Sequence, residues 1–179
     1  MNNDCSISTP PLGDEGLVLA LLLLGSNQGD RVHLLQQARR LLSQYAGKIV
    51  QQSALYESEP WGFASPCWFI NQVVEVETAL PPLQLLSVAQ QIEKTLGREK
   101  PQGARYAART MDIDILFFGG EIICTSGLIV PHPRLHERRF TLMPLCEIAP
   151  EMKHPVLKKT IRTLLQECED AGKVFLMES

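Results

Sequence analysis

The order of hydrophobic and polar residues predicts a strand followed directly by a helix near the start of the chain. An unbroken apolar run over 17–24 is too short to span a bilayer and leads into a turn at 25–27, which favours a strand buried on both faces. From Leu34 to Tyr45 apolar residues recur with the 3.6-residue helical period, and Asp30 is well placed to cap a helix there.

The same pattern predicts a loop, a strand and a second helix in the middle of the chain. Residues 48–56 are compatible with a strand, and the Pro- and Gly-containing stretch 59–66 is typical of a loop. Apolar and polar residues alternate over 68–78, which indicates a strand. The apolar stripe of 81–96 has proline in its first turn and is followed by Gly97, so a helix is expected there.

Another strand is expected over 111–118, and the glycine pair at 119–120 predicts a hairpin that returns through 121–124. The resulting order, β-α-β-β-α-β, is the ferredoxin-like α+β pattern, in which both helices pack on one face of an antiparallel-rich sheet. Short helices are expected after it, near 141–148 and 160–170.

Composition favours one folded unit. The 179 residues, of which 45% are apolar, suffice for a single core, which we expect over 17–179. Residues 1–16 are polar and aperiodic, so we expect a mobile leader. The net charge of −3 creates no basic field, and we therefore expect neither nucleic acid nor a membrane as partner. The sequence does not reveal the oligomeric state, and a monomer is the default expectation.

The cysteines indicate a reducing compartment. There are five, widely spaced and without a C-x-x-C pair, which fits neither a disulfide framework nor a zinc knuckle. No Lys or Arg precedes Arg31, which argues against a signal peptide. We therefore expect a cytoplasmic protein.

Two aspartates interrupt the apolar strand at 111–118. Strand alternation places Asp112 and Asp114 on one face, roughly 6.6 Å apart along the chain. Burying two like charges together is unfavourable unless a divalent cation with a preference for hard oxygen ligands, such as Mg²⁺, lies between them. The spacing alone equally suits two solvated aspartates on an open sheet face.

A basic stretch directly before these aspartates favours the metal site over two solvated aspartates. Residues 98–109 contain a single acid, Glu99, and four bases, which are Arg98, Lys100, Arg105 and Arg109. Guanidinium groups beside paired carboxylates are what a magnesium–polyphosphate complex requires, although a solvated loop would have a similar composition. The chain contains no Walker motif, so a P-loop is excluded.

Aromatic and amide side chains suggest a site for a planar heterocycle. Phe69 and Asn71 share one face of the strand at 68–78, and Trp61 and Phe63 lie in the preceding loop. Stacking would supply affinity and the amide would supply orientation, whereas the alternative is ordinary packing at the rim of the core.

Histidines at 132 and 136 have a spacing found in helical metal sites. Pro131 and Pro133 argue against a helix there, so zinc is not expected. His132, with nearby arginines at 134, 138 and 139, could instead donate hydrogen bonds to a nucleotide, or be solvated.

Four segments in order resemble the 6-hydroxymethyl-7,8-dihydropterin pyrophosphokinase family of folate synthesis. The most specific is RYAARTMDID at 105–114, supported by GSN at 25–27, FIN at 69–71 and VPH at 130–132. The resemblance extends over about 19–165 and implies the same ferredoxin-like fold.

The resemblance also implies roles for individual residues. Asp112 and Asp114 correspond to ligands of two magnesium ions that bridge the ATP phosphates, and Arg98 and Arg109 correspond to catalytic contacts with the transferred phosphates. The corresponding ATP-binding residues are Gln90, Glu93, Arg105, Tyr106, His132 and Arg138. The corresponding pterin-binding residues, with the ring between the two phenylalanines, are Ser58, Pro60, Trp61, Phe69, Asn71 and Phe140.

The implied reaction is in-line attack by the pterin hydroxymethyl oxygen on the β-phosphorus of ATP, which yields AMP and needs no dedicated strong base. Two departures, Ala108 where proline is usual and Tyr106 where tryptophan or asparagine is common, concern loop stiffness and nucleotide stacking. Two alternatives are a two-metal nucleotidyltransferase, which would release pyrophosphate, and a non-catalytic ferredoxin-like binding module.

Overall fold

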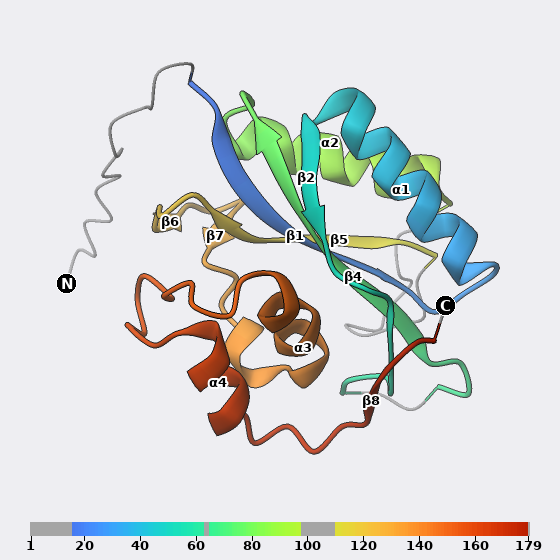
Figure 1. Cartoon of the computed structure of the whole chain (residues 1–179). Coiled ribbons are helices and arrows are strands. Elements are labelled where there is room, and N and C mark those ends of the chain that lie inside the picture. Colours follow the sequence, from blue (N-terminus) through green and yellow to red (C-terminus); the bar gives the residue numbers. More distant parts are fainter. Residues whose placement is uncertain (1–15, 63–64, 98–109, 179) are drawn as a thin grey trace.

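The structure, a computed structural model, describes residues 16–62, 65–97 and 110–178, so the expected leader lies almost wholly outside it. One antiparallel sheet is covered by helices on both faces, with a small hairpin beside it (Figure 1). The elements in chain order are β1 (Val18–Ser26), α1 (Arg31–Tyr45), β2 (Lys48–Gln52), β3 (Tyr56–Ser58), β4 (Phe69–Thr78), α2 (Pro82–Thr95), β5 (Asp112–Phe118), β6 (Ile123–Cys124), β7 (Ile129–Val130), the 3₁₀ helix η1 (Leu135–Glu137), α3 (Arg139–Ile148), α4 (Ile161–Glu167) and β8 (Val174–Leu176).

The main sheet has the order β5-β1-β4-β3-β8. Strand β2 also pairs with β4, at residues 74–77, whereas β3 pairs with residues 69–71. Every pairing within this sheet is antiparallel. The expected single strand over 48–56 is divided into β2 and β3, because the Ser53 hydroxyl takes the place of a backbone acceptor for the Val73 N–H at 3.0 Å. With that division, the strand order agrees with the predicted β-α-β-β-α-β pattern.

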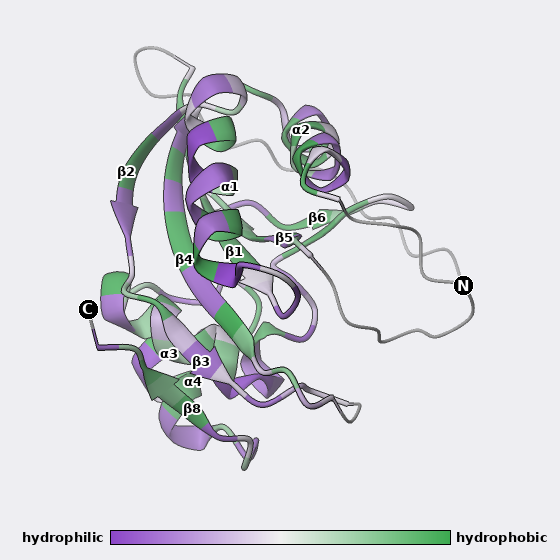
Figure 2. Cartoon of the chain, turned by 90° about the vertical axis from the view of Figure 1, so that its right-hand side faces the viewer, coloured by the Kyte–Doolittle hydropathy of each residue, from purple (hydrophilic) through white to green (hydrophobic). Residues whose placement is uncertain are grey.

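Helices α1 and α2 cover one face of the sheet, as expected. The Asp30 carboxylate caps α1 by accepting from the His33 N–H at 3.0 Å. The apolar stripe of α1 packs against the sheet. Both helices carry apolar and polar residues in alternation (Figure 2). Tyr45 was expected in the buried stripe but is 57% exposed, because α1 ends there and Ala46 takes the buried place.

Helices α3 and α4 cover the opposite face. Leu142 and Ile161 belong to a second apolar cluster with Leu21 and Leu23 of β1, while Leu22 belongs to the cluster beneath α1 and α2. From Ala20 onward β1 is therefore buried on both faces, as predicted, whereas Leu17 and Leu19 at the start of the apolar run are exposed. The two expected C-terminal helices are also confirmed as α3 and α4.

The hairpin predicted at 119–120 is wrong. The Gly119 N–H donates to the Leu19 carbonyl at 2.8 Å, which keeps the end of β5 on β1 rather than starting a return strand. The reversal lies further on, where the Thr125 hydroxyl accepts from the Leu128 N–H at 3.0 Å and β6 pairs with β7. Strand β8 was not predicted at all.

Within the described ranges, no helix combines the length and apolarity needed to cross a bilayer. In the same ranges Cys67, Cys124, Cys146 and Cys168 are free thiols.

We predict that acid destabilises the protein in part through buried His154. Its Nδ1 accepts from the N–H groups of Val156 and Leu157 at 3.2 and 3.1 Å, which requires the neutral ring, and burial, then His136, lowers its pKa. A lowered folded-state pKa gives stability that is present above about pH 6.5 and is lost as the pH falls below it. His154→Asn keeps an acceptor without titrating, so urea unfolding at pH 8 and pH 5 should show a smaller acid loss than in wild type. Equal losses would contradict this assignment.

Candidate active site

The predicted site residues that the structure describes gather where β1 ends and β4 and β5 begin. Gly25 of β1 is the Cα partner of Asn71 on one side and of Asp112 on the other. Residues directly opposite one another in an antiparallel sheet project from the same face, so the amide and the carboxylate flank a position that has no side chain. Two strand spacings separate their backbones by about 10 Å.

Two carboxylates project from β5 on that face. Asp112 and Asp114 are half-buried, whereas Ile113 between them is buried in the opposite apolar cluster. Within the described residues, no group of three or more His, Cys, Asp or Glu side chains could hold a metal ion by itself. A cation bound at this pair would therefore complete its coordination with water or an anionic ligand, which is how Mg²⁺ is commonly held with substrate phosphates.

Glu93 of α2 fixes the backbone between these aspartates. Its side chain is 5% exposed, and its Oε1 accepts from the Ile113 N–H at 2.8 Å. The hydrogen bond links α2 to the end of β5 and so orients both carboxylates. Sequence reasoning included Glu93 in the nucleotide site, and this backbone contact is a role that only the fold reveals.

His132 interacts electrostatically with Asp112 and is neutral at physiological pH. Burial, and then the charge of Arg138, lowers its pKa to about 4 despite the opposing effect of Asp112. Its Nδ1 accepts from the Arg134 N–H at 3.2 Å, so the ring proton resides on Nε2. His132 can therefore donate a hydrogen bond to a ligand throughout pH 5–8.

A buried polar pair lies on the other side of Gly25. The Asn71 amide nitrogen donates to the Ser58 hydroxyl at 2.8 Å, and each residue is 2% exposed. A β-carbon placed on Gly25 would approach Asn71 Oδ1 to 3.2 Å and Phe69 Cδ1 to 3.8 Å. The missing side chain at Gly25 thus leaves room beside the amide oxygen and the ring.

Ser58 of this pair lines a pocket of about 290 Å³. Four of the expected pterin-binding residues contribute to the lining, namely Ser58, Pro60, Trp61 and Phe140, whereas the other two, Phe69 and Asn71, do not line it. The Arg138 guanidinium lies 4.8 Å from the centroid of the Trp61 ring and 5.7 Å from that of Phe140. In the described part of the chain, the buried Nε–H of Arg138 has no hydrogen-bond partner, so this donor remains for a ligand.

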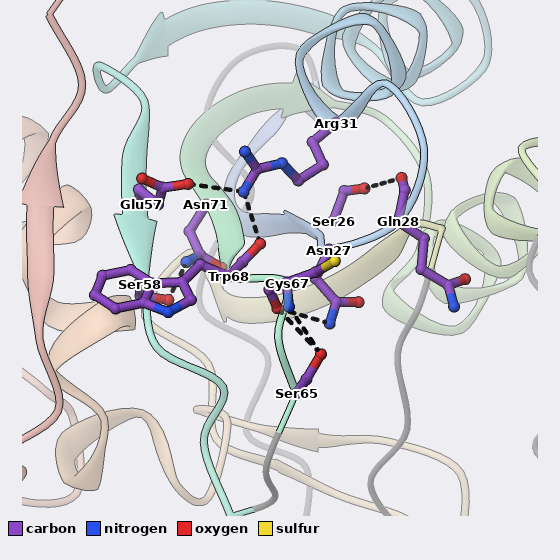
Figure 3. Close-up of polar contacts among 10 residues, drawn as sticks. All are labelled: Ser26, Asn27, Gln28, Arg31, Glu57, Ser58, Ser65, Cys67, Trp68 and Asn71. Carbon is purple, nitrogen blue, oxygen red and sulfur yellow. Dashed lines mark hydrogen bonds and ion pairs between the residues drawn. The ribbon is translucent and has the colours of Figure 1, made fainter.

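Polar contacts hold the strands that enter the site (Figure 3). Arg31 at the start of α1 donates to Glu57 Oε1 at 2.8 Å and to the Trp68 carbonyl at 2.7 Å, which joins β3 to the start of β4. Asn27 donates to the Cys67 carbonyl at 3.4 Å. Sequence reasoning did not identify Arg31 and Glu57, because these partners are distant in sequence and lack a local motif.

Glu147 provides a second connection that sequence reasoning did not identify. Its carboxylate accepts from the Ala54 N–H at 3.1 Å and from the Tyr56 hydroxyl at 2.9 Å, which attaches α3 to the start of β3. Burial, and then Glu147, raises the pKa of Tyr56 to about 12, so the hydroxyl remains a donor. Strand β3 and helix α3, which both line the pocket, are therefore held in a fixed position relative to each other.

Gln90 is exposed on α2, and no described contact brings it into this group. Arg98, Arg105, Tyr106 and Arg109 lie outside the described residues, as do Ala108 and Phe63.

Sequence comparisons identify relatives of the chain. The family model for 7,8-dihydro-6-hydroxymethylpterin-pyrophosphokinase (HPPK) matches residues 21–150. The 2-amino-4-hydroxy-6-hydroxymethyldihydropteridine pyrophosphokinase of Bacillus subtilis (strain 168) is 46% identical over 136 residues, which are 75% of this chain and 80% of that protein. The enzyme of the same name from Porphyromonas gingivalis is 41% identical over 141 residues, which are 78% of this chain and 95% of that one.

Longer proteins contain a similar unit. The folic acid synthesis protein fol1 of Pneumocystis carinii is 41% identical over 147 residues, which cover 82% of this chain but 20% of that protein. The crystal structure of wild-type Plasmodium falciparum HPPK-DHPS superposes with a TM-score of 0.69 at 22% identity. That match covers 87% of this chain and 46% of the solved chain, so the present chain spans less than half of its length.

We predict that Glu93→Ala lowers the free energy of unfolding by about 2–4 kcal/mol, because it leaves the buried Ile113 N–H without its acceptor and opens a cavity. Glu93→Gln retains an acceptor oxygen and should recover most of that loss. Urea unfolding of the three proteins measures the effect. Equal stability of the alanine and wild-type proteins would show that the contact does not hold β5.

Proposed function

Because the chain belongs to the 7,8-dihydro-6-hydroxymethylpterin-pyrophosphokinase family, we propose that the two halves of its active site lie on either side of Gly25. One half is the aspartate pair, and the other is Asn71 together with the pocket that its partner Ser58 lines. Members of this family are folate-synthesis enzymes, and the chain is accordingly an ATP-dependent diphosphotransferase that acts on hydroxymethyldihydropterin.

The nucleotide half contains the carboxylates of Asp112 and Asp114, which we assign to two magnesium ions. Their hard oxygen donors, partial exposure and common face suit cations that arrive with a polyphosphate. Bound magnesium would neutralise charge on the phosphates. His132 interacts electrostatically with Asp112 and offers its Nε2–H, which supports a hydrogen bond to ATP.

Further nucleotide contacts are assigned from the family resemblance. Arg98 and Arg109 would contact the transferred phosphates. The residues assigned to ATP binding, besides His132, are Gln90, Glu93, Arg105, Tyr106 and Arg138. The Glu93 carboxylate supports this half by orienting the strand that carries the aspartates.

The pterin half contains Asn71, whose amide is held by the buried Ser58 hydroxyl. An amide offers both a donor and an acceptor, which suits the hydrogen-bonding edge of a pterin ring. We assign ring stacking to Phe69 and Phe140, with Pro60 and Trp61 at the pocket wall. A mostly apolar pocket with a few fixed polar groups is the usual form of a small-molecule site.

The register across β4, β1 and β5 carries this proposal. Because Asn71 and Asp112 flank Gly25, a pterin oriented by the amide would direct its hydroxymethyl group along the sheet face toward the nucleotide. The hydroxymethyl oxygen would form a bond to the β-phosphorus, the bond from that phosphorus to the α,β-bridging oxygen would break, and AMP would leave. The hydroxyl proton passes to solvent. Positioning of the reactants supplies most of the acceleration in such a transfer.

We further propose that the enzyme acts in the cytoplasm as a monomer. The cytoplasmic location is supported by widely spaced cysteines with no paired motif, and the monomer is the default for a chain of this size.

We predict that Asp114→Asn lowers pterin-dependent AMP formation at least about a hundredfold, because it removes a charged metal ligand while keeping the side-chain shape. Purified variant and wild type are incubated with magnesium, ATP and 6-hydroxymethyl-7,8-dihydropterin, and nucleotides are separated by chromatography. Glu151→Gln, which removes an exposed carboxylate paired with Arg162, serves as the control. Wild-type-like turnover of Asp114→Asn would refute the metal assignment, and pyrophosphate in place of AMP would indicate a nucleotidyltransferase.

We predict that Gly25→Ala raises the KM for the pterin about tenfold with little change in the KM for ATP. The added β-carbon crowds Asn71 Oδ1 and Phe69, and the change introduces no backbone strain because the φ of Gly25 is not positive. Gly120→Ala, where a β-carbon meets nothing within 4 Å, is the matched control. Equal pterin KM values for all three proteins would show that the space at Gly25 is not used.

A further inference from the structure

The pocket has a wall that comes from the C-terminal segment of the chain. Besides the residues of β3, the following loop and α3, its lining includes Asp170, Gly172, Lys173 and Val174. These residues lead into β8, which pairs with β3 at the edge of the sheet (Figure 2). Neither periodicity nor the family resemblance, which extends to about Leu165, pointed to it.

Val174 continues the row of expected pterin residues. Ser58 of β3 is the Cα partner of Phe69 on β4 and of Val174 on β8. All three side chains therefore project from one face of the sheet, and Val174 is half-buried there. Phe175 projects from the opposite face, where its ring stacks on Trp68 with centroids 6.0 Å apart.

The start of the segment 170–174 is fixed to α3, the helix that contributes Phe140 to the pocket. The Asp170 carboxylate accepts from the backbone N–H of Arg139 at 3.0 Å and from that of Gly172 at 2.9 Å. Arg139 is the first residue of α3, whose own N-cap residue Arg138 supplies no side-chain cap. Asp170 therefore caps the helix that begins beside Phe140, and a carboxylate is favourable at that end.

The other end of the segment is fixed to the loop after β3. The Glu59 N–H donates to the Lys173 carbonyl at 3.1 Å, and the Lys173 N–H donates to Glu59 Oε2 at 3.0 Å. The attachment points, Arg139 and Glu59, each adjoin an expected pterin residue, which are Phe140 and Ser58. A segment held at both ends in this way can define the size of the pocket.

We propose that the segment 170–174 is a wall of the pterin pocket and that Val174 determines which ring substituents the enzyme accepts. This inference rests on the proposed placement of the pterin beside Ser58 and Asn71. The pocket volume of about 290 Å³ lies at the small end for ligand sites. A larger side chain at position 174 therefore excludes the substrate, and a smaller one admits larger dihydropterins. An apolar side chain here disfavours polar substituents on the ring edge that faces it.

The test compares Val174→Phe, Val174→Ala and the control Phe175→Leu, which changes the adjacent residue on the opposite face. We expect Val174→Phe to raise the pterin KM at least about tenfold with the ATP KM unchanged, since overpacking a filled site carries a penalty of that size. Val174→Ala should raise kcat/KM for ring-alkylated dihydropterins about tenfold relative to the natural substrate. Phe175→Leu should match wild type in both assays.

The outcomes separate the two proposals. If wild type forms AMP while Val174→Phe folds normally by urea unfolding and keeps the wild-type pterin KM, the wall assignment is overturned and the proposed function stands. If Val174→Phe does not fold, the selectivity of Val174→Ala decides, and an unchanged preference among ring-alkylated dihydropterins overturns the proposal. If wild type forms no pterin-dependent AMP, the proposed function itself fails.

Discussion

The register of β1 against its two neighbours is the constraint on which the site depends. Gly25 faces Asn71 and Asp112 only because β1, β4 and β5 are paired as they are. A slip of one residue in either pairing would turn the amide or the carboxylate to the opposite face, into a cluster of buried apolar side chains. The chemistry of the site is thus inseparable from the alignment of three strands.

Burial on both sides of β1 explains why that alignment is stable. Leu22 and Leu24 pack beneath α1 and α2, whereas Leu21 and Leu23 pack against the layer of α3 and α4. Any slip would exchange these two sets and disrupt both clusters, which would be energetically costly. Buried hydrogen bonds from Glu93 and Ser58 then fix the backbone of β5 and the Asn71 amide within the frame. Apolar packing specifies the register, and the polar contacts set the orientation of individual groups.

Local patterns in the sequence predicted the parts of the fold that local physics decides. The apolar run of β1, the capped helix after Asp30 and the common face of Asp112 and Asp114 all follow from residue spacing. The hairpin after β5 was wrong, because the pairing of Gly119 with Leu19 depends on a strand distant in sequence. Strand β8 was missed for the same reason, since only its pairing with β3 makes this short exposed segment a strand. The family resemblance supplied the substrate assignments, which spacing alone left open.

A crystal structure of the protein with magnesium, α,β-methylene-ATP and 6-hydroxymethyl-7,8-dihydropterin tests the account most directly. The methylene group replaces the bridging oxygen whose bond must break, so both substrates would remain in place. The account predicts metal on the carboxylates of Asp112 and Asp114, the pterin ring hydrogen-bonded to Asn71, and the hydroxymethyl oxygen directed across Gly25 toward the β-phosphorus. A nucleotide–metal complex bound away from the aspartates, or a pterin bound away from Asn71, would contradict it.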